Sequence, residues 1–349
     1  MSTKPRPTPC VVNGRKEQSV VPVSSVFEAF GIRSVQQVAS DMRFVLGRMG
    51  RGFQLGLSSL GSIRPDLSLP AYAGMVPDDG LSPIYNLFDR VGGGKGYRQR
   101  VTRKWARDFR DKSLTYDEHD GTDFVCPIGT RLCAAAPGRV LMIRDRWLRG
   151  GITLGIDHGN GLLTQYTHCW RPLVSIGHTV RRGEPVALSG ASGLDMTLFF
   201  PWVPPHIHFM VWLNGRPQDP YLAEGEEERP GVWLHRNDPR PADVDPEEEI
   251  PKVSDVDTKA IDEIAAACMD AKIRKELAAA AGNYPVLAAI LEDALHHDDW
   301  AWPEGFRDRT ARPPMKPPKI KLTLPLPIGH YRGACFGDPK LSLKEKLGW

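Results

Sequence analysis

The sequence has few of the features that mark zinc-ribbon, disulfide-rich or nucleic-acid-binding proteins. Its 349 residues include only six cysteines, at positions 10, 126, 133, 169, 268 and 335, and none of them forms a C-x-x-C pair. This spacing indicates neither a zinc ribbon nor a dense disulfide framework, and it favours buried free thiols. The formal net charge is only +3. So small a value gives no argument for binding to nucleic acid, and we expect no nucleic-acid partner.

Long apolar runs are missing as well. No stretch reaches the roughly 20 residues that span a bilayer, because prolines at 201, 204 and 205 interrupt the most apolar segment, residues 199–212. The first 24 residues contain neither the apolar core nor the small-residue cleavage site of a secretory signal peptide. We therefore expect no membrane span and a chain that is cytoplasmic when it is synthesised.

The composition that is present changes along the chain and predicts six segments. They are a flexible N-terminus (1–24), a small helical or irregular region (25–84), a β-rich domain (85–224), an acidic Pro-rich linker (225–256), a helical hairpin (257–300) and a basic Pro-rich tail (301–349). In the third segment, short runs of Val, Ile, Leu and Thr alternate with Gly, Pro, Asn and Asp, which is typical of antiparallel sheets. The predicted fold class is mainly β, with helical additions at both ends.

Two histidines enter the β-rich domain's last apolar run, in "PWVPPHIHFMVW" (201–212). Side chains alternate between the faces of a strand, so His206 and His208 share one face, roughly 7 Å apart. Imidazoles on a half-buried surface must find hydrogen-bond partners or bind a ligand, because an unpaired buried polar group costs a few kcal/mol. Taken alone, the pair is better explained by core or surface histidines with ordinary hydrogen-bond partners than by a site.

Two further motifs favour a site. In "YDEHDGTDF", His119 and Asp123 are four positions apart, and on a strand or a helix this spacing lets both side chains point the same way. Histidine nitrogen and aspartate oxygen are ordinary zinc ligands, and catalytic zinc commonly has three protein ligands. His119, Asp123 and one member of the 206/208 pair would make three. His168, at the end of "TQYTH", and the remaining imidazole could then exchange protons with an activated water.

The order of these motifs is similar to that of the lysostaphin-type (LytM-like) zinc metallopeptidases of bacterial cell walls. The resemblance covers 119–221 and rests on "HDGTDF", "GLLTQYTH", "IGHTVRRGEPVALSGASG" and "HIHFMVWLNGRPQDPYL". It implies that His119, Asp123 and His208 hold Zn²⁺, and that His168 and His206 act on the water and the tetrahedral intermediate. It also implies hydrolysis of the peptides of peptidoglycan, by an enzyme that acts in the periplasm or cell envelope. Because no signal peptide is seen in the first residues, we expect it to arrive there by a non-Sec route.

The chain departs from that pattern at residues 194–205, "LDMTLFFPWVPP", where the family usually has a few small polar residues. We expect this insertion to cover or reshape the rim beside His206. Asp117, Glu118 and Asp120 are expected to form a solvated acidic turn, and His296 and His297 are given no chemical role. His158 is expected to be structural.

Three other functions fit the same residues, and one of them is a cytoplasmic zinc hydrolase with an unrelated peptide substrate. A degenerate relative could bind peptidoglycan or a partner amidase and only regulate, although such relatives usually lose ligands that this chain retains. The chain could also be an antibacterial effector that a secretion machine delivers, with the same chemistry. In either case the C-terminal helices and tail are candidates for contact with a protein partner.

Overall fold

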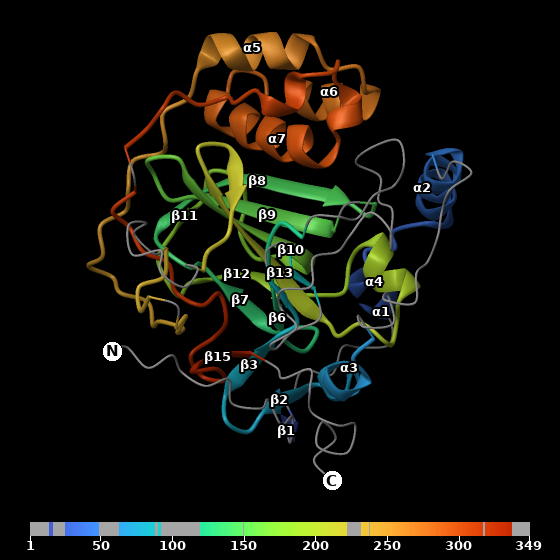
Figure 1. Cartoon of the computed structure of the whole chain (residues 1–349), viewed down its shortest axis with the longest axis vertical. Coiled ribbons are helices and arrows are strands. Elements are labelled where there is room, and N and C mark those ends of the chain that lie inside the picture. The colour runs from blue at the N-terminus through green and yellow to red at the C-terminus, as the bar shows by residue number, and fades with distance from the viewer. Residues whose placement is uncertain are drawn as a thin grey trace.

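Most strands of the β-rich segment belong to one large sheet in the computed structural model of the chain, shown in Figure 1. The structure describes residues 14–16, 25–48, 63–87, 90–91, 119–148, 150–221, 232–236, 238–316 and 318–336.

Within the described residues, eleven strands make up this sheet, and neighbouring strands are antiparallel except for one pair. The main path runs β11-β8-β9-β10-β13-β6-β3-β15, with β12 and β7 paired beyond β10, and β14 paired to β13. The strands are β3 (Leu81–Ile84), β6 (Thr122–Val125), β7 (Arg131–Cys133), β8 (Gly138–Arg146), β9 (Gly151–Asp157), β10 (Leu162–Pro172), β11 (Thr179–Val180), β12 (Pro185–Ser189), β13 (His206–Leu213), β14 (Arg216–Gln218) and β15 (Gly333–Phe336). The exception is β15, which lies parallel to β3.

Helices come from both sides of the β-rich segment. Before the β-rich segment lie α1 (Val26–Ala29), α2 (Val35–Arg48) and α3 (Pro65–Tyr72), and α4 (Leu194–Leu198) lies between β12 and β13 in the chain. The C-terminal side gives α5 (Thr258–Ala266), α6 (Ala271–Ala279) and α7 (Tyr284–His297), followed by short 3₁₀ turns η4 (Asp299–Ala301) and η5 (Phe306–Asp308). Small two-stranded pairs join β1 (Gly14–Lys16) to β2 (Met75–Pro77) and β4 (Asn86–Leu87) to β5 (Arg90–Val91).

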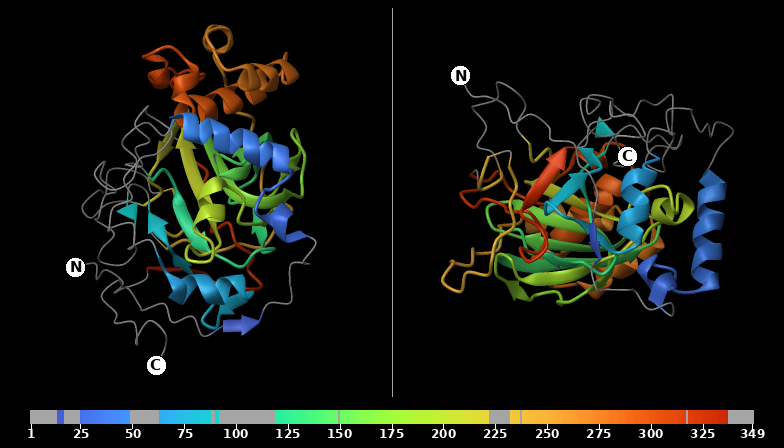
Figure 2. Two further views of the ribbon diagram at one scale, coloured as in Figure 1. Left: turned by 90° about the vertical axis from the view of Figure 1, so that its right-hand side faces the viewer. Right: turned by 90° about the horizontal axis from the view of Figure 1, so that it is seen from below.

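The two faces of the sheet bury different partners. On β13, the face that carries Met210 and Trp212 packs into one core with α5, α6 and α7, which lie together above β8 in Figure 1. The alternate residues Ile207, Phe209 and Val211 face a second core. That core is completed by Trp233 and by residues 322–331 of the C-terminal segment. Figure 2 shows the helical layer and the sheet from two further sides.

Strand alternation links this layering to the histidines. His206, His208, Met210 and Trp212 occupy alternate positions of β13 and therefore share one face. The helices cover the Met210 and Trp212 end of that face. The two histidines stand at the beginning of the strand, beside the end of α7. The sequence placed them on one face, and the structure adds that this is the helix-covered face.

The fold class is confirmed: the sheet is mostly antiparallel and helices are added at both ends. The segment boundaries stay predictions, but several elements differ in type from what was expected of their segments. β1 lies within the segment expected to be a flexible N-terminus, and β2 lies within the segment expected to be helical or irregular. β3 lies within the segment expected to be helical or irregular, β15 lies within the tail, and residues 257–300 form three helices rather than a hairpin of two. The four cysteines at 126, 133, 169 and 268 are free, as expected, whereas Cys335 is disulfide-bonded.

Candidate metal centre

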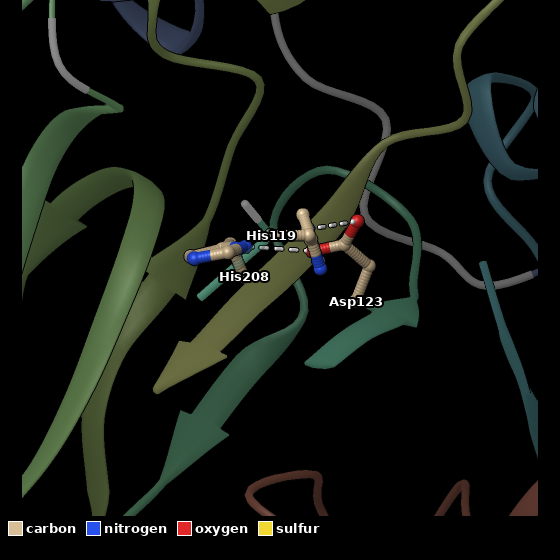
Figure 3. Close-up of side chains that lie close together, drawn as sticks. All are labelled: His119, Asp123 and His208. Atoms are coloured by element: carbon tan, nitrogen blue, oxygen red, sulfur yellow. Dashed lines mark hydrogen bonds and ion pairs between the residues drawn. The ribbon is translucent and has the colours of Figure 1, made fainter. Parts of the chain in front are cut away.

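The centre is built on two neighbouring strands. Asp123 of β6 and His208 of β13 are direct cross-strand partners, a position that brings side chains on one face close together. Nδ1 of His208 lies 2.8 Å from Oδ1 of Asp123. Figure 3 shows the His119 side chain converging on the same carboxylate from the segment just before β6, with its Nε2 atom 3.1 Å from Oδ2 of Asp123.

Close approach of the backbone makes this convergence possible. Gly121, in the middle of "HDGTD", lies against β13: a Cβ atom there would stand 2.8 Å from Nε2 of His208 and 2.8 Å from the carbonyl oxygen of Phe209. Contacts that short do not occur, so a side chain at position 121 would push the backbone of residues 119–123 away from His208. The glycine thus keeps His119 and Asp123 in register with the strand that carries His208.

Asn86 of β4 also holds the Asp123 carboxylate, and no sequence motif predicted it. Its side-chain amide donates a hydrogen bond of 2.6 Å to Oδ2 of Asp123. Tyr85, next to it, places its ring 5.6 Å from that of His206. Both residues precede the β-rich motifs by more than thirty positions, so only the pairing of β3 with β6 brings them to the site.

Two more imidazoles stand beside this group, and backbone carbonyls fix their tautomers. Nδ1 of His206 donates to the carbonyl of Pro204 at 2.7 Å, and Nδ1 of His168 donates to the carbonyl of Ser192 at 2.7 Å. The Nε2 atom of each neutral ring is then an acceptor. The two rings meet edge to face with their centroids 4.9 Å apart. The pair can therefore accept protons near Asp123.

His168 reaches this position through an irregularity in β10. From Tyr166 to Cys169 strand β10 advances by three residues, while its partner β9 advances by only two. Strand β10 therefore contains one extra residue at this point. His168 takes a positive φ of 63° there. Bulges of this kind re-aim a side chain, and a non-glycine residue in the left-handed region costs about 1–3 kcal/mol. The surrounding structure maintains that strain where the imidazole is turned toward His206.

The electrostatics of the group keep Asp123 ionised and stabilise positive charge beside it. Burial alone would raise the pKa of Asp123, but the imidazoles of His119 and His206 lower it well below its usual value. Burial likewise would lower the pKa of His208, whereas its hydrogen bonds to Asp120 and Asp123 raise it to about 10. The carboxylate is thus kept ionised in a buried position, and positive charge is stabilised beside it.

His119, Asp123 and His208 form a group that could hold a metal ion, since one ligand atom from each lies within 4.8 Å of the others. Two imidazole nitrogens and a carboxylate oxygen suit zinc, which accepts N, O and S ligands. Both oxygens of Asp123 already face imidazole nitrogens. The donor set and its convergence therefore fit the ion that the sequence predicts.

One prediction near the site is wrong. Asp120 was expected in a solvated turn, but it is only 7% exposed. Its carboxylate lies 3.0 Å from Nε2 of His208, 2.7 Å from Nε2 of His296 and 3.3 Å from Nε2 of His297. The docking of α7 buries it, and that docking cannot be read from the local sequence. Asp117 and Glu118 lie outside the described residues. His158 is buried and hydrogen-bonded, as a structural residue should be.

The insertion at 194–205 forms α4 and an exposed apolar turn. Leu198, Phe199, Phe200 and Trp202 are all exposed, while Met196 is buried. Asp195 of α4 stands 3.8 Å from Nε2 of His168. The insertion therefore borders the site on the His168 side as well as preceding His206, and its effect on access stays a prediction.

A buried His/Asp/His group with two adjacent imidazole bases has the makeup of a metal-dependent hydrolase site. Residues 117–220, which contain all five side chains, match the profile of peptidase family M23. This segment of the chain is therefore a peptidase M23 domain of the lysostaphin type.

Curated relatives include two proteins of Vibrio cholerae. The chain is 36% identical over 151 residues to the peptidoglycan DD-endopeptidase ShyB and 37% identical over 99 residues to the peptidoglycan DD-endopeptidase ShyA. These matches cover 43% and 28% of this chain, and 34% and 21% of the relatives. The chain thus spans about a third or less of the length of these relatives.

Solved structures give local matches. The catalytic domain of lysostaphin from Staphylococcus simulans is 28% identical, with a TM-score of 0.27, over 30% of this chain and 77% of that domain. A zinc-containing peptidase from Vibrio cholerae is also 28% identical, with a TM-score of 0.28, over 43% of this chain and 46% of the peptidase chain. At such TM-scores the family assignment rests on the sequence match. No helix in the described part of the chain has the length and apolar character needed to cross a membrane.

Proposed function

We propose that the chain is a zinc-dependent endopeptidase that hydrolyses peptide cross-links or stems of bacterial peptidoglycan. The observation that carries the proposal is the convergence of His119, Asp123 and His208 on one point, inside a peptidase M23 domain. The relatives ShyB and ShyA, whose names describe peptidoglycan DD-endopeptidases, support the substrate class.

In this proposal His119, Asp123 and His208 hold the zinc ion. When bound, zinc supplies Lewis-acid chemistry, activating water as the nucleophile and polarising the carbonyl group of the peptide bond. The ionised Asp123 contributes negative charge to the ligand set, and Asn86 fixes its orientation through the 2.6 Å hydrogen bond. The ring orientation of His208 brings Nδ1, rather than Nε2, toward the other two ligands.

His168 and His206 move the protons. Each presents an Nε2 acceptor because its Nδ1–H is engaged by a backbone carbonyl. An imidazole can take the proton of the attacking water and return it to the leaving amine. Burial lowers the pKa of His206 to about 4, despite the opposing effect of Asp123, so its ring is neutral near pH 7 and its Nε2 atom is free to accept a proton.

Peptidoglycan lies in the cell envelope, and we infer that the protein acts there. Delivery as an antibacterial effector is the specific version of this proposal. It predicts toxicity when the chain is directed to the periplasm of a susceptible cell and none when it stays in the cytoplasm. A partner protein bound through the C-terminal helices and tail belongs to the same proposal.

The test is digestion of purified sacculi by the wild type and by His208→Ala, with zinc measured on both proteins. The wild type should hold one zinc ion per chain and release peptides from cross-linked muropeptides, whereas His208→Ala should do neither. A wild type without stoichiometric zinc would contradict the ligand assignment.

Zinc binding without cleavage, but with retention on sacculi, would instead favour a regulator that binds peptidoglycan. A relative from Escherichia coli is named as a murein hydrolase activator, EnvC, and is 42% identical over 66 residues, which are 19% of this chain and 15% of EnvC.

A further inference from the structure

A second group of titratable side chains adjoins the metal centre and is supplied in part by the C-terminal helices. Asp120 stands between His208 on one side and His296 and His297, at the end of α7, on the other. The ligand His208 and the two helix residues are separated by more than 85 positions in the sequence. The family motif accounts for His208 but gives no role to the other three residues.

We propose that Asp120, anchored by His296 and His297, is a positioning residue for the metal ligand His208. The proposal rests on the function proposed above, in which Nδ1 of His208 is a zinc ligand. Metal-ligating histidines commonly donate their other ring N–H to a carboxylate, which fixes the ring orientation and makes the ligand more basic. Here that carboxylate is Asp120, 3.0 Å from Nε2 of His208.

The geometry assigns the two oxygens of Asp120 to different partners. Oδ1 accepts from His208, and Oδ2 accepts from Nε2 of His296 at 2.7 Å. His297 approaches Oδ2 as well, at 3.3 Å. A carboxylate held at both ends cannot rotate away from His208 without breaking bonds to the helix, so its direction is set by α7.

His297 is itself fixed over the sheet. Its Nδ1 donates to the carbonyl of Asp293 at 3.0 Å, one turn earlier on α7. The carboxylate of Asp293 accepts from Gln165 of β10 at 2.9 Å and forms an ion pair with Arg144 of β8. A continuous set of polar contacts thus runs from strands β8 and β10, through α7, to the carboxylate beside His208.

Apolar packing holds the same helix end in place. The ring of Trp212 on β13 meets that of His296 edge to face, with centroids 5.4 Å apart. Trp212 and α7 share one hydrophobic core. Because Trp212 and His208 lie on the same face of the same strand, the helix cannot shift along that face without disturbing both contacts. The C-terminal helical layer therefore supports the metal centre directly.

The experiment measures zinc affinity by competition with a chelator for the full-length wild type, Asp120→Asn, Asp120→Ala and His296→Gln/His297→Gln, with thermal unfolding of each zinc-free protein as the folding control. Loss of the carboxylate–histidine contact typically lowers metal affinity by about 10- to 100-fold, and Asp120→Ala should fall in that range. Asp120→Asn keeps an oxygen that can accept from His208, so its loss should be smaller. The helix double variant should weaken zinc binding in the same direction.

The matched control is His178→Gln, because His178 is exposed, contacts Glu184 and lies away from the centre. It should bind zinc as the wild type does. Folded Asp120 and helix variants that retain wild-type zinc affinity would overturn the proposal. So would a second zinc ion per chain that disappears in the helix double variant, since the Asp120 group would then be a metal site of its own. A wild type that binds no zinc contradicts the proposed function instead, which separates the two failures.

Discussion

At the scale of single residues, the chemistry depends on which ring nitrogen each histidine turns toward the centre. His168 and His206 engage backbone carbonyls through Nδ1, whereas His208 turns Nδ1 inward and Nε2 toward Asp120. The sequence predicted the five residues, because strand alternation and the motif order bring them together. It could not predict the tautomers, which depend on carbonyl groups that no side-chain pattern reports.

His168→Ala and His208→Ala should separate binding from catalysis. His168→Ala keeps all three proposed ligands and loses a proton acceptor, so we expect wild-type zinc content with kcat lower by on the order of 10²–10⁴. His208→Ala should lose both zinc and activity. Steady-state kinetics on a cross-linked muropeptide, with metal analysis of each protein, measures this. Loss of zinc from His168→Ala would show that His168 is a ligand rather than a base.

His158 makes stability depend on pH at a point remote from the centre. Burial lowers its pKa to about 4, although the carbonyl of Pro137 partly opposes the shift. The unfolded chain binds the proton near pH 6.5, so stability rises with pH between about 4 and 6.5 and is lost as pH falls through that window. His158→Gln should reduce the difference in unfolding free energy between about pH 7 and about pH 4.5 by up to roughly 3 kcal/mol. Urea titrations at both pH values measure it, and an unchanged difference would refute it.

At the scale of elements, the structure differs from the sequence expectations where pairing is long-range. β3 and β15 are short and lie more than 240 residues apart in sequence, yet they pair in parallel. Propensity over three or four residues cannot indicate such a pairing. The three C-terminal helices, by contrast, follow the periodicity of their apolar residues, and Asp257, Asp270 and Asn283 cap their N-termini.

Arg312 should be essential for holding helix α7 against strand β9. It forms buried ion pairs with Glu292 of α7, at 2.9 Å, and with Asp157 of β9, at 3.3 Å. Arg312→Ala leaves two buried carboxylates without a cation and should cost about 3–5 kcal/mol of unfolding free energy. Chemical denaturation measures this. The control is Arg309→Ala, whose pair with Glu263 is half exposed and should contribute less than about 1 kcal/mol. Equal losses would contradict the account.

At the scale of the whole molecule, the catalytic segment does not stand alone. Asn86 reaches the proposed ligand Asp123 from the N-terminal side, and α7 reaches Asp120 from the C-terminal side. The motif order in 119–221 predicted the family and the candidate ligands from sequence. Asp120 was misjudged because a local stretch of acidic residues looks solvated until a helix 176 residues away covers it.

We propose above that this centre hydrolyses an amide bond in peptidoglycan. The most direct measurement is incubation of a purified cross-linked muropeptide with the zinc-loaded chain in water enriched in oxygen-18, followed by mass spectrometry. The account predicts that the cross-link is cut, that oxygen-18 enters the new carboxyl group, and that His208→Ala produces neither change. An intact muropeptide in the presence of a chain that holds one zinc ion would contradict it.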